Sequence, residues 1–100
     1  MIVDPDTWGL GDKRRIDGSR FPPQVLARVD DAQGGRFCLE CRRGEWAKPT
    51  DVPLELDHKR PLARGGDNHW SNLQWLCRWH NRKKKGGALS GKPLTPPWAK

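Results

Sequence analysis

One stretch of the chain shows apolar residues at helical spacing. The segment PPQVLARVDDAQ begins with two prolines, places Val25, Leu26 and Val29 on one side, and is followed by a Gly-Gly pair. Prolines are favoured in the first turn of a helix and glycines after its last turn, so the pattern predicts one short helix around residues 23–32. Residues 1–21 mix turn formers and charges without a period, which predicts an irregular arm that can dock on the rest of the chain.

Two further stretches alternate between apolar and polar residues. LELDH, at the start of residues 54–64, predicts a strand or the first arm of a hairpin, and LQWLC predicts a short strand. GGDNHWSN, between them, predicts a loop, and RFCLECRRGEW predicts a compact turn between two short strands. RWHNRKKK predicts about two turns of helix with lysines at the end that the helix dipole favours, and residues 88–100 predict a Pro-rich tail.

The composition shows that the chain is short of core material. Leu, Ile, Val and Phe make up 18 of the 100 residues and the net charge is +7, which borders on the composition of disordered chains. A small domain of this kind needs another source of stability, and the six Trp and three Cys are the candidates. No apolar run approaches the roughly 20 residues of a membrane span. The first ten residues lack the features of a secretory signal, so we expect an intracellular chain.

Positive charge is concentrated in the C-terminal half. Residues 59–100 contain 10 Lys and Arg against 1 Asp, whereas residues 1–58 contain 9 basic and 11 acidic residues. Such an excess is typical of proteins that bind a polyanion, and nucleic acid is the most common one. The alternative is a basic surface that serves only solubility.

The cysteines are spaced as metal-binding pairs. Cys38 and Cys41 form Cys-x-x-Cys, Cys77 and His80 form Cys-x-x-His, and 35 residues separate the two pairs. Each pair can place both ligand atoms on one side of a turn, and together they supply the four ligands of a closed, structural Zn²⁺ site, which would add the missing stability. The alternatives are a redox dithiol, whose usual βαβ context is missing, or three unrelated buried thiols.

A second group consists of oxygen and imidazole donors. Asp57 and His58 end the first alternating stretch, Asn72 lies in the loop, and Asn81 follows His80 but lies about 100° away around the helix. Asp57 and Asn81 offer oxygen ligands of the kind that Mg²⁺ prefers. A histidine such as His58 is a suitable general base, because an unperturbed imidazole titrates near neutral pH. The alternatives are a surface Asp-His pair and an asparagine that only caps or faces solvent.

The order CLEC, LELDHKRPLARGG and NLQWLCRWHNRKK resembles the HNH endonuclease family, in particular its zinc-stapled members with two ligand pairs around a ββα-metal core. VLARVDD resembles the short helix that often precedes the first pair. The resemblance implies a small α+β, metal-stapled fold with a short N-terminal helix and irregular termini. We accordingly expect an arm at 1–21, an HNH nuclease domain with structural zinc at 22–87, and a tail at 88–100.

The resemblance assigns a role to each residue of the second group. His58 matches the histidine that takes a proton from the attacking water, and Asn72 matches the asparagine that holds this imidazole in its working orientation. Asn81 stands where the last histidine of the motif usually lies, and with Asp57 it would ligate a catalytic Mg²⁺ or Mn²⁺ ion. Lys84 occupies a position where a basic residue is common.

A few positions depart from the family pattern or stand outside it. His80 stands where the fourth zinc ligand is usually cysteine, a substitution that zinc tolerates. Lys59 replaces an apolar residue, which bears on the packing of the hairpin and not on the site. His69, in the loop, is expected to be exposed, and the tryptophans are expected to pack around the metal and the core rather than to stack on bases.

The implied function is a metal-dependent DNA endonuclease that hydrolyses phosphodiester bonds by a one-metal mechanism with a His general base. Six basic side chains would grip DNA phosphates, namely Arg60, Arg64, Arg82, Lys83, Lys84 and Lys85. The chain resembles stand-alone phage and prophage members in size, which implies the cytoplasm of a bacterial host cell and, besides DNA, phage packaging proteins or a second copy of the chain as partners. The alternative functions are a catalytically silent, zinc-containing nucleic-acid-binding module and a packaging or interaction subunit that docks on an acidic partner.

Overall fold

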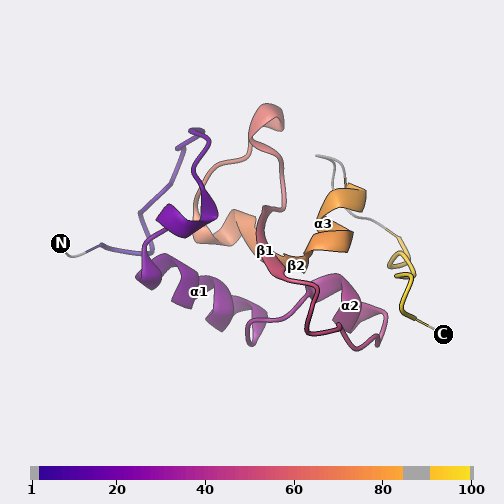
Figure 1. The fold of residues 1–100 in the computed structure, drawn as a ribbon. Helices are drawn as coiled ribbons and strands as arrows, with labels where there is room; N and C mark the ends of the chain where they lie inside the picture. The colour runs from indigo at the N-terminus through magenta and orange to yellow at the C-terminus, as the bar shows by residue number, and fades with distance from the viewer. Residues whose placement is uncertain (1–2, 85–90, 100) are drawn as a thin grey trace.

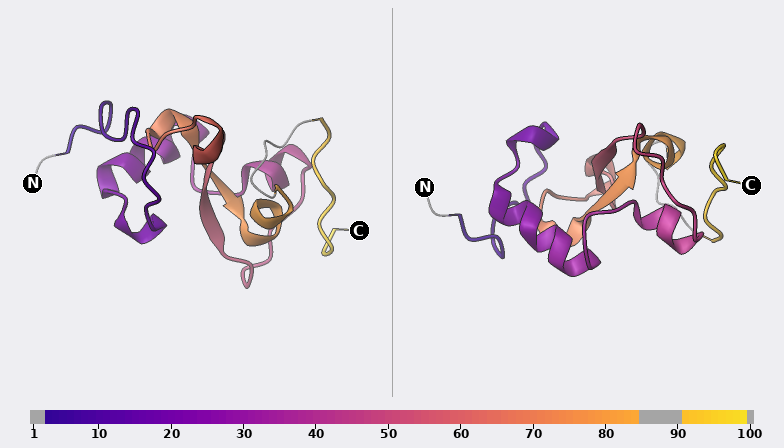
Figure 2. Two further views of the ribbon diagram at one scale, coloured as in Figure 1. Left: turned by 90° about the horizontal axis from the view of Figure 1, so that it is seen from above. Right: turned by 60° about the horizontal axis from the view of Figure 1, so that its bottom comes forward.

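The computed structural model describes residues 3–84 and 91–99 of the chain. The elements follow one another as α1 (Pro23–Gln33), α2 (Leu39–Arg43), β1 (Leu54–His58), β2 (Leu73–Cys77) and α3 (Arg78–Lys84). The β1–β2 hairpin lies in the middle of the molecule, with α1 towards one end and with α2 and α3 towards the other (Figure 1). The N-terminal arm and the C-terminal segment 91–99 lie at opposite ends (Figure 2). The hairpin and α3 form a ββα unit within a small α+β fold, as expected.

Most of the predicted elements are confirmed, and one is wrong. Helix α1 begins at Pro23 and ends before Gly34, whose φ of 86° is the left-handed conformation that stops a helix. Both strands and the last helix also form where the sequence predicts them. The segment RFCLECRRGEW instead contains α2, because Cys38 Sγ accepts a hydrogen bond from the N–H of Cys41 and caps this helix. Within the part of the chain that the structure describes, β1 and β2 are the only strands.

The hairpin is antiparallel, and its loop is closed by Asn72. Leu54 pairs with Cys77 at one end of the ribbon and His58 pairs with Leu73 at the other. Asn72 Oδ1 accepts a hydrogen bond from the N–H of Arg60 at 2.9 Å, and Nδ2 donates to the carbonyls of Arg60 at 3.0 Å and Asp67 at 2.8 Å. These bonds tie the two ends of the loop together directly after His58.

Two apolar clusters hold the elements together. The first packs α1 against the hairpin and contains Phe21, Val25, Val29, Leu73 and Trp75, so the expected core position of Trp75 is confirmed. The second lies around α2 and the end of β2, and three of its four buried residues are cysteines. Thiols contribute less buried hydrocarbon than Leu or Ile, so the buried apolar core at this end of the molecule is small. No helix in residues 3–84 or 91–99 is long and apolar enough to cross a membrane.

Candidate functional site

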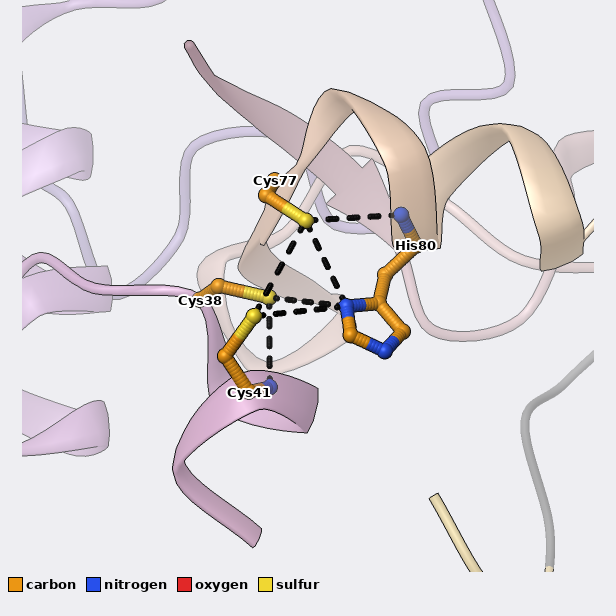
Figure 3. Close-up of side chains that lie close together, drawn as sticks. All are labelled: Cys38, Cys41, Cys77 and His80. Atoms are coloured by element: carbon orange, nitrogen blue, oxygen red, sulfur yellow. Dashed lines mark hydrogen bonds between the residues drawn. The ribbon is translucent and has the colours of Figure 1, made fainter. Parts of the chain in front are cut away.

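The two ligand pairs converge on one point between α2 and α3 (Figure 3). The ligand atoms of Cys38, Cys41, Cys77 and His80 all lie within 4.8 Å of one another. His80 Nδ1 is 3.5 Å from the sulfurs of Cys38 and Cys41 and 3.3 Å from that of Cys77. A tetrahedral zinc site separates its ligand atoms by roughly 3.6–3.8 Å, given its usual bond lengths. The four side chains can therefore hold a metal ion such as zinc.

The same local turn builds both pairs. The N–H of Cys41 donates to Cys38 Sγ at 3.4 Å, and the N–H of His80 donates to Cys77 Sγ at 3.4 Å. Each bond closes the turn and brings the second ligand beside the first. His80 Nε2 donates to the carbonyl of Leu94 at 2.9 Å, which leaves Nδ1 free to face the sulfurs.

The environment of the thiols fits a bound cation. Burial raises the pKa of the Cys41 and Cys77 thiols, and the neighbouring Cys38 raises both further. Thiolates in such a place need a compensating positive charge, which a metal ion supplies as it displaces the protons. All four ligands are buried, and a tetrahedral ion that they hold would have no position left for a substrate. The inclusion of His80 favours a metal site over a redox dithiol.

A second site is a cleft of about 480 Å³ that contains Asp57, His58 and Asn81. Asp57 and His58 are neighbours in β1, so their side chains leave opposite faces of the ribbon. No residue of β2 lines the cleft. The cleft instead lies between the end of β1, the loop that follows it, and α3, which contributes Asn81 and Lys84.

The imidazole of His58 is held by Asn68. Asn68 is fully buried, and its Oδ1 lies 2.7 Å from His58 Nε2. The prediction that Asn72 contacts and orients this imidazole is therefore corrected: the hydrogen bond belongs to Asn68. The amide of Asn72 is occupied by the backbone of Arg60 and Asp67, so it positions the loop and not the ring.

The carboxylate of Asp57 lies in a buried ion pair. Asp57 Oδ2 accepts hydrogen bonds from Lys84 Nζ at 2.7 Å and from Gln74 Nε2 at 2.9 Å. Lys84 Nζ also donates to the carbonyl of His58. The Lys84 side chain is 2% exposed, so the prediction that Lys84 grips DNA phosphate is wrong. Asn81 and Lys84 are three residues apart on α3, and this spacing turns both towards β1.

Asn81 is bound by an acid that the sequence analysis did not single out. Its Nδ2 donates to Glu55 Oε1 at 3.0 Å, and Arg78 Nε donates to Glu55 Oε2 at 3.2 Å. Glu55 and Asp57 are two residues apart in β1, so both face α3. Because the Asn81 nitrogen is bound to Glu55, its Oδ1 is the atom left for a ligand. A carboxylate and an amide oxygen from residues that line one cleft fit a hard divalent cation that keeps several waters.

Four of the remaining predicted phosphate contacts lie on the surface of the described chain. Arg60, Arg64, Arg82 and Lys83 are all exposed. Arg64 lines the cleft itself, and Arg60 Nε donates to the carbonyl of Arg64 at 2.7 Å. Lys85 lies outside the residues that the structure describes.

His69, expected to be exposed, is only 7% exposed. Its Nε2 donates to the carbonyl of Asp6 at 2.7 Å, and its Nδ1 lies 2.8 Å from the hydroxyl of Ser71. The contact with Asp6 explains the burial, because the N-terminal arm covers this part of the loop. His69 is therefore a structural residue of the loop.

Sequence reasoning missed three residues of the second site, namely Asn68, Glu55 and Arg15, which lines the cleft from the N-terminal arm. Asn68 stands in the loop GGDNHWSN, four residues before Asn72, and composition alone does not choose between the two. The period of two in LELDH does place Glu55 on the same face as Asp57. No local sequence pattern marks Arg15 as a residue of the site, because its position depends on how the arm packs on the rest of the chain.

The family model of the HNH endonucleases matches residues 38–87. This segment is half of the chain and contains both ligand pairs, the hairpin and α3. Comparison of the chain with curated proteins and with solved structures found no match. The matched segment and the ββα unit agree with each other, and the chain belongs to the HNH endonuclease family.

Proposed function

We propose that the chain is a metal-dependent endonuclease that hydrolyses phosphodiester bonds of DNA, with His58 as the general base. The observation that supports this most directly is the cleft that joins the His58 imidazole to oxygen donors from Asp57 and Asn81. Membership of a nuclease family supports the same class of reaction. A module that only binds DNA has no need of a base beside ligands for a hard cation.

His58 would accept a proton from a water molecule while the water oxygen bonds to phosphorus and the bond to the leaving 3′-oxygen breaks. A Mg²⁺ or Mn²⁺ ion held by Asp57 and Asn81 would stabilise the charge that develops on the phosphate and the leaving oxygen. Lys84 bonds both the Asp57 carboxylate and the His58 carbonyl. It therefore fixes the metal ligand and the base relative to each other.

Exposed cations would hold the DNA. Arg60, Arg64, Arg82 and Lys83 offer flexible positive charges that bind phosphates without reading bases. Arg15 adds a cation that lines the cleft from the N-terminal arm. A contact between Lys85 and DNA phosphate remains a prediction from the sequence. The same holds for a phage origin, a location in the bacterial cytoplasm, and packaging proteins or a second copy of the chain as partners.

The ion at the first site would be zinc, with a structural role. Three thiolates and one imidazole are ligands that zinc prefers, and a closed set of four leaves it no catalytic position. The bound ion would supply the stability that the small apolar core at this end of the molecule lacks.

A plasmid-nicking assay tests the proposed nuclease, with and without Mg²⁺ or Mn²⁺. His58→Ala is expected to lower the cleavage rate by roughly 10²-fold or more, the usual contribution of a positioned base, while DNA binding is retained. Lys59→Ala is the matched control, because Lys59 is an exposed neighbour. If His58→Ala cleaves as fast as Lys59→Ala at saturating metal, His58 is not the base and the DNA-binding module becomes the better interpretation.

A further inference from the structure

The N-terminal arm packs on the loop that follows His58, although the arm lies outside the segment that the family model matches. The contacts include hydrogen bonds to three loop residues on either side of Asn68. Lys13 Nζ donates to the carbonyl of Gly65 at 2.9 Å, Asp67 Oδ2 accepts from the N–H of Gly11 at 2.9 Å, and His69 Nε2 donates to the carbonyl of Asp6 at 2.7 Å. The arm thus covers the loop on both sides of Asn68.

Asn68 itself is held by two carbonyl groups of the arm. Its N–H donates to the carbonyl of Asp12 at 2.9 Å, and its Nδ2 donates to the carbonyl of Arg14 at 2.8 Å. A carbonyl oxygen can only accept, so the nitrogen of the Asn68 amide must face Arg14. Its oxygen must then face His58 Nε2, 2.7 Å away. An oxygen that only accepts requires a proton on Nε2, which leaves the lone pair of the neutral imidazole on Nδ1.

We propose that the N-terminal arm is a working part of the active site, because its carbonyls at Asp12 and Arg14 orient Asn68 so that His58 presents Nδ1 as the base. This proposal rests on the proposed function, in which His58 takes a proton from water. Asn68 is a positioning residue, since it acts through His58. The arm thus supplies hydrogen-bond acceptors for Asn68 from outside residues 38–87, the segment that the family model matches.

Two further features of the arm support this arrangement. Arg14 donates to the Asp12 carboxylate through its side chain and its backbone N–H, and these bonds, which lower the pKa of Asp12 to about 2, hold the turn that carries both carbonyls. The ring of Phe21 lies 6.5 Å from the His58 ring, and Trp8 packs edge-on against Phe21 at 5.4 Å. The half-buried imidazole therefore has Phe21, which the arm contacts through Trp8, beside its ring.

Two glycines of the arm provide a matched pair of variants. Gly9 and Gly11 both have positive φ, 82° and 69°, so a side chain strains the backbone at either position. A Cβ at Gly9 would lie 2.5 Å from the carbonyl oxygen of Asn68, whereas a Cβ at Gly11 would meet no atom within 4 Å. Both variants therefore strain the backbone of the arm. Gly9→Ala in addition pushes the arm away from Asn68, whereas Gly11→Ala does not.

The experiment records the tautomer of His58 by long-range ¹H–¹⁵N NMR in the zinc-loaded 100-residue chain, with the signal identified by its loss in His58→Ala. The unchanged protein and Gly11→Ala are expected to show the Nε2–H tautomer alone. Asn68→Ala and Gly9→Ala are expected to show a mixture of both tautomers, with cleavage at least tenfold slower and DNA affinity unchanged. Zinc content and circular dichroism establish that each variant is folded.

The proposal is overturned if Asn68→Ala or Gly9→Ala retains a pure Nε2–H tautomer, or if Gly11→Ala changes the tautomer as much as Gly9→Ala does. If Asn68→Ala does not fold because the buried amide is lost, Gly9→Ala still tests the proposal, since it leaves the Asn68 side chain in place. The tautomer is measured without DNA, so it is independent of the nuclease assay. If His58→Ala cleaves DNA as fast as the unchanged protein, the proposed function is overturned. The NMR result would then still show whether the arm orients Asn68 towards His58.

Discussion

Replacement of Lys84 by alanine tests whether the buried ion pair beside the cleft is a structural element of the site. The side chains of Lys84 and Asp57 are 2% and 10% exposed, and the two charged atoms lie 2.7 Å apart. The variant leaves the Asp57 carboxylate with Gln74 as its one remaining side-chain donor among the described residues. Removal of one partner from a buried pair costs about 3–5 kcal/mol, because the other charge stays buried and unpaired.

This loss is large for a chain of this size. Small domains have a total stability of about 5–15 kcal/mol, and about 1 kcal/mol corresponds to roughly 4–8 °C in Tm for a domain of about 100 residues. We therefore expect the zinc-loaded Lys84→Ala variant to unfold at least about 12 °C below the unchanged protein. The measurement is thermal unfolding followed by circular dichroism.

Divalent ions should restore part of this stability. The Lys84 ammonium lies against the Asp57 oxygen that we propose as a metal ligand, so it repels a cation there. Without it, added Mg²⁺ or Mn²⁺ is expected to raise Tm more in Lys84→Ala than in the unchanged protein, since binding to the folded state alone is stabilising. An equal gain in both proteins would argue against Asp57 as a ligand of the ion.

Lys83→Ala is the control for this experiment. Lys83 is exposed and its Nζ lies over the Trp79 ring at 5.5 Å, so its loss should change stability by about 0.5 kcal/mol or less. If Lys84→Ala unfolds at the same temperature as Lys83→Ala, the buried ion pair does not stabilise the fold and the reasoning above is refuted.

Three further predictions concern the metals and the DNA. Purified protein should carry about one zinc, and Cys41→Ser or a strong chelator should abolish cooperative unfolding in circular dichroism, whereas a folded protein free of zinc would contradict the closed site. Asn81→Ala should fold but need more Mg²⁺ or Mn²⁺ to reach half-maximal cleavage, because the ion loses a ligand, and an unchanged metal titration would exclude that role. The double variant Arg82→Ala with Lys83→Ala should bind all DNA sequences more weakly and reduce the salt slope by up to about two phosphate contacts, so an unaltered slope would place both residues away from the DNA.

Local patterns in the sequence determined the elements and the first site. The helical spacing around Val25, the alternation in LELDH and LQWLC, and the flanking glycines each act over a few residues, so they could be predicted and the structure confirms them. The metal cluster was predictable for the same reason, because each ligand pair is one turn whose geometry depends on its own backbone. Only the meeting of the two pairs needed the fold.

The tertiary structure decided how the residues of the cleft are paired. Which loop asparagine reaches His58 depends on carbonyls of the arm, 54 residues away from Asn68 in the sequence, so no local period signals it. Lys84 belongs to a basic run that was expected to contact DNA phosphates, but the packing of α3 on β1 turns it onto Asp57 and buries it. A short-range pattern sets the conformation of a segment, whereas the partner of a polar side chain is set by long-range packing, because each buried polar group must be satisfied by whatever the fold brings beside it.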